Sequence, residues 1–158
     1  MDMTKKTLAK EIMTTEVVTV NSDDTIEKVA QLMLKHHISG MPVVDGEGKL
    51  VGIISEGDLL IQDKEIKAPA MTVFFGGIIY LENPSRFNKE LKRIIALKVS
   101  ELMSTKVYAV GPEDPIEKVI GIISEKEVNR VPVVDENKRL LGIISRQDII
   151  KAKHVWYF

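Results

Sequence analysis

A stretch of 49 residues occurs twice in this chain of 158 residues. Residues 12–60 align with residues 102–150 without a gap, and 19 of the aligned positions are identical. The heptad Gly-Ile-Ile-Ser-x-x-Asp at 52–58 returns at 142–148. A unit this short leaves much of its apolar surface exposed when it folds alone, so we expect the two copies to pack together. Two similar units that face each other form clefts, and clefts bind small molecules.

The composition is that of a soluble globular protein, with 44% hydrophobic and 28% charged residues. The net charge of −1 gives no general field that would attract nucleic acid or an anionic membrane. The absence of cysteine excludes disulfides and thiol chemistry. No apolar stretch typical of a signal peptide follows the N-terminus, and the longest apolar run, at 73–81, is too short to span a bilayer as a helix. We therefore predict a cytoplasmic protein.

Each copy predicts the element order β-α-β-β-α. In the first copy we expect a strand at 17–20, a helix from 26, a hairpin of 41–44 and 50–54, and a helix from about 55. In the second copy we expect a strand at 107–110, a helix from 116, a hairpin of 131–134 and 140–144, and a helix from about 145. Asp24 and Asp114 are suited to the N-caps of the first helices, and Pro115 to the first helical position.

The predicted fold class is α+β, with two tandem repeats packed as a pseudo-two-fold pair and a segment inserted between them. The expected divisions are a first repeat at 8–63, an inserted segment with a linking helix at 64–98, a second repeat at 99–153 and an aromatic C-terminal tail at 154–158. The unrepeated stretch 61–98 is too apolar for a flexible linker. We expect it to pack on the module or on a dimer partner, with a docking patch for another protein as the alternative. The aromatic tail is expected to pack on a neighbour.

The pair Ser-x-x-Asp stands at a strand-to-helix junction in both copies, as Ser55 with Asp58 and Ser145 with Asp148. The local pattern favours a capping box, in which the serine caps the helix and the acidic residue reaches back to it. Aspartate is short for that role, which glutamate or glutamine usually fills. The competing hypothesis is therefore a binding function for the same two side chains.

A ligand site at this junction has a physical basis. A helix N-terminus and a serine hydroxyl offer donors to a phosphate, and a nearby carboxylate can accept the two hydroxyls of a ribose. Gly52 and Gly142 lie inside the preceding strands, where glycine marks the close approach of a ligand or of another backbone. Serine and aspartate together would then form a minimal clamp for a ribose phosphate.

The motifs also resemble those of a known family. A hydrophobic residue followed by Pro-Val-Val-Asp at 41–45 and 131–135, the heptads at 52–58 and 142–148, and the openings Ile-Met-Thr at 12–14 and Leu-Met-Ser at 102–104 are similar to those of CBS domains. Two copies resemble a CBS pair, or Bateman module; the resemblance does not cover 61–98. It implies a module that binds AMP, ADP, ATP or S-adenosylmethionine as a ligand, with no obligatory cofactor.

The resemblance also implies roles for individual residues. Asp58 and Asp148 would hold the ribose hydroxyls, and Ser55 and Ser145 would face phosphate. The stretch before Pro-Val-Val would line the base or the phosphates; its members here are Ile38, Ser39, Gly40, Met41, Val128, Asn129, Arg130 and Val131. The segments near 20–22 and 110–112 would contribute as well.

The two expected sites differ in charge. Arg146 stands where the first copy has Glu56, and Arg130 stands where it has Gly40. Arginine favours phosphate, whereas a nearby carboxylate repels it. We therefore predict that the second-repeat site takes a phosphorylated nucleotide and that the first is weaker or prefers an uncharged adenosyl compound. Unchanged nucleotide affinity in an Arg146→Ala variant would contradict this ranking.

Other chemistries find little support. The chain has no Gly-x-Ser-x-Gly elbow, no phosphate-loop lysine and no nucleophile–base set, which argues against an enzyme. His36 and His37 are neighbours on a predicted helix and so do not share a face, which argues against a metal site. A basic helix face is expected to be solvated, with RNA contact as an alternative; it comprises Lys89, Lys92, Arg93 and Lys98.

These patterns lead to one main hypothesis: a stand-alone regulatory ligand sensor that passes a conformational signal to an unknown partner protein. A homodimer is expected, since such dimers are usual in the family that the chain resembles and isologous dimers are the commonest oligomers. The first alternative is a structural or interaction module with empty clefts. The second is a small enzyme that uses the 61–98 insert, and the third is an RNA-binding protein.

Overall fold

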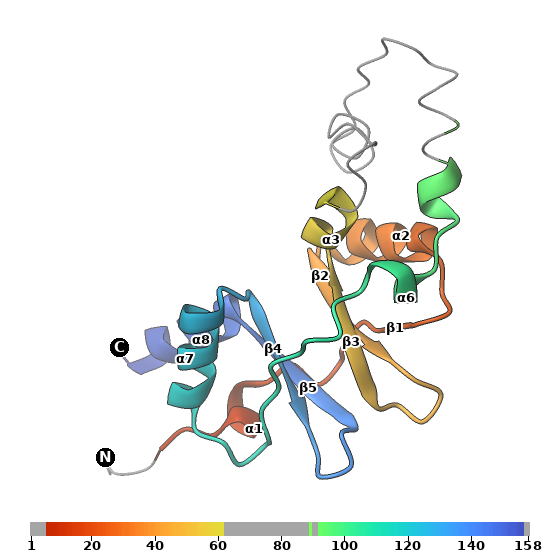
Figure 1. The fold of residues 1–158 in the computed structure, drawn as a ribbon. Helices are drawn as coiled ribbons and strands as arrows, with labels where there is room; N and C mark the ends of the chain where they lie inside the picture. Colours follow the sequence, from red (N-terminus) through yellow and green to blue (C-terminus); the bar gives the residue numbers. More distant parts are fainter. Residues whose placement is uncertain (1–5, 62–88, 90–91, 157–158) are drawn as a thin grey trace. The chain divides into compact units, whose positions relative to one another are not determined.

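The computed structural model describes residues 6–61, 89 and 92–156, which form two compact units (Figure 1). The first-repeat unit contains the described residues of Val18–Asp45 and Val51–Lys106. The second-repeat unit contains those of Met1–Val17, Gly46–Leu50 and Val107–Phe158. Each unit therefore takes the segment that opens the repeat from the other copy.

The first-repeat unit has a three-stranded sheet of order β1-β2-β3, in which β1 runs parallel to β2. Val20 lies opposite Val43 and Asn21 opposite Val44. Its elements are β1 (Val20–Asn21), α2 (Ile26–His36), β2 (Gly40–Val44), β3 (Leu50–Ser55), α3 (Glu56–Ile61) and α6 (Val99–Leu102). The order β-α-β-β-α predicted for the first copy is confirmed.

The second-repeat unit has the corresponding helix, hairpin and helix around the antiparallel pair β4 and β5, with a register shift between Val133 and Val134. Its elements are α1 (Ala9–Ile12), α7 (Ile116–Lys126), β4 (Arg130–Val134), β5 (Leu140–Ser145) and α8 (Arg146–Trp156). Val110 forms a single parallel bridge to Val133, at the place where β1 pairs with β2 in the other unit. The α+β fold class with two repeats is confirmed.

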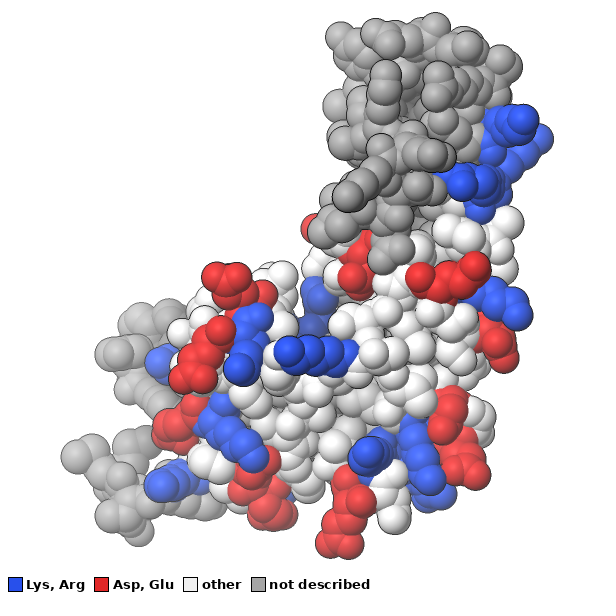
Figure 2. All heavy atoms as spheres, in the orientation of Figure 1, with Lys and Arg blue, Asp and Glu red and all other residues white. Residues whose placement is uncertain are grey.

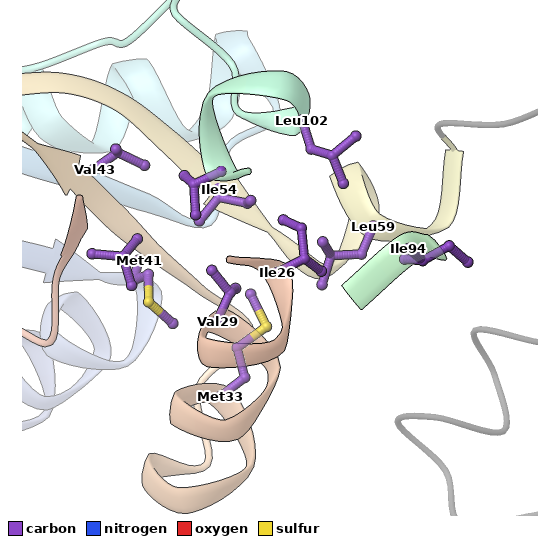
Figure 3. Close-up of a cluster of buried hydrophobic side chains, with 11 residues drawn as sticks. Ile26, Val29, Met33, Met41, Val43, Ile54, Leu59, Ile94 and Leu102 are labelled. Atoms are coloured by element: carbon purple, nitrogen blue, oxygen red, sulfur yellow. The ribbon is translucent and has the colours of Figure 1, made fainter. Parts of the chain in front are cut away.

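Each unit has its own hydrophobic core between its first long helix and its sheet. In the first-repeat unit, Ile26, Val29 and Met33 on one face of α2 pack with Met41 of β2 and Ile54 of β3 (Figure 3). The core of the second-repeat unit includes Val119, Ile123, Val131, Val133 and Ile144. Burial of one such side chain contributes roughly 1.5–3 kcal/mol, so the helical spacing of these residues anchors each helix to its sheet.

The helix starts differ in detail from the prediction. Helix α7 begins one residue after Pro115, which takes the N-cap position itself. The carboxylate of Asp114 instead accepts a hydrogen bond from the Gly111 backbone N–H at 2.7 Å, and Asp24 accepts one from the Asn21 N–H at 2.8 Å. The expectation of aspartate at the N-cap was wrong, because these carboxylates close the turn before the helix.

This turn changes the acidity of both aspartates. The backbone N–H of Asn21 lowers the pKa of Asp24 below its ordinary value, against the opposing effect of burial. An ion pair with Lys28 at 3.1 Å lowers the pKa of Asp24 further. Asp114 repeats the arrangement, with the Gly111 N–H and Lys118 as the causes of its lowered pKa. Both carboxylates therefore stabilise the fold in their ionised form.

The first strands are shorter than predicted. In place of strands at 17–20 and 107–110, the structure has the two-residue β1 and the single bridge of Val110. The chain passes from one unit into the other at Val17 and Val18, and again at Lys106 and Val107. Only the ends of these valine-rich runs therefore reach a partner strand.

The insert is described only at its end. Lys89 and residues 92–95 are helical, and Ile94 is buried in the core of the first-repeat unit. The prediction that this helix extends to Lys98 was wrong, because Lys98 has an extended backbone and is the N-cap of α6. The predictions for the apolar run at 73–81 lie outside the described residues. Helix α8 continues to Trp156, so the predicted tail is helical at 154–156, and 157–158 lie outside the described residues. Among the described helices, none is long and apolar enough to cross a membrane.

Candidate functional site

In the second-repeat unit, Ser145 and Asp148 meet where β5 ends and α8 begins. Oδ2 of Asp148 accepts hydrogen bonds from the Ser145 backbone N–H at 2.8 Å and from the Ser145 hydroxyl at 3.0 Å. The Asp148 N–H donates in turn to Oγ of Ser145 at 3.2 Å. These reciprocal bonds form a capping box in which aspartate replaces the usual glutamate.

The first-repeat unit has nearly the same arrangement between β3 and α3. Oδ2 of Asp58 accepts from the Ser55 backbone N–H at 2.8 Å and from its hydroxyl at 3.2 Å. Within the described residues, no hydrogen bond reaches Oδ1 of Asp58. Both aspartates are half-buried. In each unit the backbone holds one carboxylate oxygen in place, and an ionised carboxylate keeps further acceptor capacity for a ligand hydroxyl.

The strand glycines are explained by another backbone. A Cβ on Gly142 would lie 2.9 Å from the Thr14 carbonyl oxygen, and a Cβ on Gly52 would lie 2.9 Å from that of Ser104. Thr14 forms an antiparallel bridge with Ile143 of β5, with hydrogen bonds of 2.9 and 3.0 Å. The close approach of another backbone, one of the two causes that the sequence allows, is present at both glycines.

The structure also brings Thr14 to the second motif, a contact that the sequence analysis missed. The hydroxyl of Thr14 lies 3.5 Å from Oδ1 of Asp148, the oxygen that Ser145 does not use. The equivalent residue of the first-repeat unit, Ser104, donates its hydroxyl to the Lys106 carbonyl at 3.5 Å instead. Because 134 positions separate Thr14 from Asp148, no local pattern signals this contact.

The stretches predicted to line a ligand lie beside the two motifs. Across the hairpin, Arg130 is the register partner of Ser145, and the Arg146 N–H donates to the Asn129 carbonyl at 3.2 Å. In the first-repeat unit the Glu56 N–H donates to the Ser39 carbonyl at 2.9 Å. These bonds tie each predicted lining stretch to the start of the following helix.

The side chains of these stretches differ in exposure. Met41 and Val131 are completely buried and belong to the hydrophobic cores. The remaining members are the half-buried Ile38, Ser39, Val128 and Arg130, the exposed Asn129 and the buried Gly40. The segments at 20–22 and 110–112 begin beside the same strands, since Val20 pairs with Val43 and Val110 with Val133. Their ends bond to other segments, with the Ser22 and Pro112 carbonyls accepting from the backbone N–H groups of Ser100 and Lys10.

Charges of both signs lie on the face of the protein drawn in Figure 2. Acidic and basic side chains are interspersed over both units on that face. Lys89, Lys92, Arg93 and Lys98 of the predicted basic face are exposed. No group of three or more histidine, aspartate or glutamate side chains that could hold a metal ion occurs in the part of the chain that the structure describes.

Comparison with known proteins identifies the family. The model of the CBS domain matches residues 9–64 and again residues 99–155. The chain belongs to the CBS domain family. The uncharacterized protein MJ1426 of Methanocaldococcus jannaschii is 32% identical over 152 residues, which cover 92% of this chain and 90% of that protein.

Solved structures of CBS proteins have the same fold. The CBS domain of a membrane protein from Sphaerobacter thermophilus superposes with a TM-score of 0.76 at 31% identity, over 92% of this chain and 87% of that one. The CBS domain pair of protein MJ0100, solved with 5′-methylthioadenosine and S-adenosyl-L-methionine, gives 0.69 at 26% identity, over 96% and 99%.

Several enzymes also match, but this chain corresponds to only a small part of each enzyme. The inosine-5′-monophosphate dehydrogenase of Methanocaldococcus jannaschii is 31% identical over 146 residues, and the chain covers only 23% of that enzyme. Its catalytic activity therefore does not carry over to this chain.

Proposed function

We propose that the protein is a regulatory module that binds adenosyl ligands at its two Ser-x-x-Asp motifs. One observation carries the proposal: each unit holds a half-buried carboxylate at a strand-to-helix junction, with one oxygen fixed by the serine. A carboxylate oriented in this way can accept ribose hydroxyls without first losing conformational freedom. The CBS pair of MJ0100 supports the proposal, because its structure contains two adenosyl compounds.

The individual roles follow the chemistry of the side chains. Asp58 and Asp148 would accept the ribose hydroxyls, and Ser55 and Ser145 would donate to a 5′ phosphate where the ligand has one. The lining residues proposed beside them are Ile38, Ser39, Gly40, Met41, Val128, Asn129, Arg130 and Val131, with Arg146 as a further phosphate ligand. Met41 and Val131 would act through their backbone, since their side chains fill the cores.

The regulatory part of the proposal concerns the output. A ligand that binds one arrangement of the chain better than another shifts the population toward it, typically with a coupling of about 1–3 kcal/mol. In the proposed function a second copy of the chain or a partner protein in the cytoplasm reads that shift. The protein has no catalytic role in this proposal, because no nucleophile–base set is present in its sequence.

The capping geometry favours a second candidate function, a ligand-free interaction module. The capping box of Ser145 and Asp148 is complete without any ligand. In that case the motif only stabilises α8, and removal of its carboxylate changes stability and no ligand response. The two functions therefore differ in what an Asp148→Asn variant does.

The test is isothermal titration calorimetry of the wild type with AMP, ATP, S-adenosylmethionine, 5′-methylthioadenosine and GTP. We expect binding of adenosyl compounds and none of GTP. Asp58→Asn and Asp148→Asn should each weaken one site by about 10- to 100-fold, the equivalent of a charged hydrogen bond worth about 1.5–3 kcal/mol. Asp23→Asn removes an exposed carboxylate outside both motifs and is the control. If none of the compounds gives a heat of binding, the proposal is refuted in favour of the interaction module.

A further inference from the structure

The two motifs share a backbone and differ in charge. The N–H of residue 146 bonds the Asn129 carbonyl, as the N–H of residue 56 bonds the Ser39 carbonyl. On that common frame, the residue after the serine is Arg146 in one unit and Glu56 in the other, and both are exposed. The two motifs therefore place side chains of opposite charge at equivalent backbone positions.

Register adds a second charged position to the second-repeat unit. Arg130 and Ser145 are directly opposite in the β4–β5 ladder. Residues opposite each other in an antiparallel pair project from the same face of the sheet, so Arg130 emerges beside the serine of the motif. Gly40 occupies the equivalent position of the first copy and carries no side chain.

The formal charges of the motif residues and of the position opposite the serine thus have opposite sign in the two units. Arg130, Arg146 and Asp148 add to a net positive charge, whereas Glu56 and Asp58 are both negative. Adenosyl compounds differ from one another at the 5′ carbon of the ribose, close to the hydroxyls that the aspartate would hold. That substituent is anionic in ATP, neutral in 5′-methylthioadenosine and net cationic in S-adenosylmethionine, whose sulfur carries a positive charge.

We propose that the two motifs select adenosyl ligands of opposite charge, so that one chain reads two different compounds without competition between them. The second-repeat unit takes an adenosine phosphate, and the first-repeat unit takes S-adenosylmethionine in preference to any phosphate. The inference rests on the proposed function and adds which ligand each motif accepts. Arg130 and Arg146 attract the phosphates, and Glu56 attracts the sulfonium and ammonium groups.

The experiment uses single-site backgrounds of the full chain. In Asp58→Asn only the second motif is intact, and in Asp148→Asn only the first is intact. Each background is titrated with ATP, S-adenosylmethionine and 5′-methylthioadenosine at low and high salt, without magnesium. We expect ATP to bind the second motif at least tenfold more tightly than S-adenosylmethionine, and the order to reverse at the first. High salt should reduce both preferences, because exposed charges are screened over about 8 Å at physiological ionic strength.

Charge reversals then test the residues. Arg146→Glu should lower the affinity of the second motif for ATP about tenfold, which equals about 1.4 kcal/mol. The same variant should change the affinity for 5′-methylthioadenosine less than twofold. Glu56→Arg should make the first motif prefer ATP. Lys151→Glu makes the same charge reversal at an exposed position of α8, five residues after Arg146, and should leave the ATP affinity within twofold.

The outcomes separate this inference from the proposed function. If all three ligands bind but the charge reversals leave the ratio of ATP to S-adenosylmethionine affinity within twofold, the charge selection is refuted and the adenosyl sites stand. If wild type and variants bind no adenosyl compound, the proposed function and this inference are both refuted. If S-adenosylmethionine still binds at its own stoichiometry to wild type saturated with ATP, the absence of competition is supported; complete displacement would overturn it.

Discussion

Each unit contains the segment that opens the repeat of the other copy, and Gly142 in β5 offers a test of that arrangement. In Gly142→Ala the new Cβ would lie 2.6 Å from Sδ and 2.8 Å from Cγ of Met13, and 2.9 Å from the Thr14 carbonyl oxygen. Carbon atoms in contact normally lie about 3.5–4.0 Å apart. The Met13 side chain can rotate away, but the Thr14 carbonyl belongs to the backbone and accepts from Ile143 at 3.0 Å. Relief of the clash therefore requires Thr14 to move away from β5.

The magnitude follows from these contacts. Overpacking of a core position costs about 1–3 kcal/mol, and each of the two hydrogen bonds between Thr14 and Ile143 contributes about 0.5–1.5 kcal/mol. We expect Gly142→Ala to lower the free energy of unfolding by about 2–4 kcal/mol. For a chain of this size, that corresponds to a fall in Tm of roughly 5–15 °C.

The assay is thermal and urea unfolding followed by circular dichroism. Gly46→Ala is the matched control, because a Cβ there meets no atom within 4 Å, and its stability should change by less than about 0.5 kcal/mol. Adding Met13→Ala to Gly142→Ala should not restore full stability, since the contact with the Thr14 carbonyl remains. Equal Tm values for Gly142→Ala and Gly46→Ala would refute the reasoning and, with it, the placement of Met13 and Thr14 against β5.

Three further predictions concern single residues. Gly121→Ala, within α7 where a Cβ meets no atom within 4 Å, should raise the free energy of unfolding in urea by about 0.5–1 kcal/mol. A lower free energy of unfolding would contradict the helical conformation at this position. Asp24→Asn should destabilise the protein at pH 7. Because the folded-state pKa of Asp24 is lowered, its contribution to stability is complete above the ordinary value of 3.8 and is lost as pH falls below it. The stability difference between wild type and variant should therefore shrink in acid, and a difference that stays constant with pH would contradict this role of Asp24. Thr14→Val should alter adenosyl affinity only at the motif of Asp148, and Thr14→Ser, which keeps the hydroxyl, should have the affinity of the wild type. Equal titration curves for Thr14→Val and the wild type would show that the 3.5 Å contact has no role.

The duplicated sequence predicts most of the fold because its signals are local. Helical spacing of Ile26, Val29 and Met33 identifies the buried face of α2, and the structure buries that face. The meeting of serine and aspartate is also local, since Ser145 and Asp148 are three positions apart at a helix start. Such features depend on backbone periodicity, which a single copy of the repeat already contains.

The remaining features depend on contacts between distant positions. Within a unit, Thr14 bridges Ile143 in β5 of the other copy, a pairing that no local propensity decides. Of the valine-rich run at 17–20, only Val20 belongs to a strand, the two-residue β1. The turn that draws Asp114 to the Gly111 N–H competes with helix capping, and the sequence alone does not say which is preferred.

A structure of the protein with a bound ligand would test the central claim most directly. After crystallisation with ATP and S-adenosylmethionine together, the account predicts an adenosyl ligand in each unit. The ribose hydroxyls should lie about 2.5–3.0 Å from a carboxylate oxygen of Asp148 and of Asp58. An adenosyl ligand bound elsewhere, with both carboxylates engaged only by Ser145 and Ser55, would contradict it.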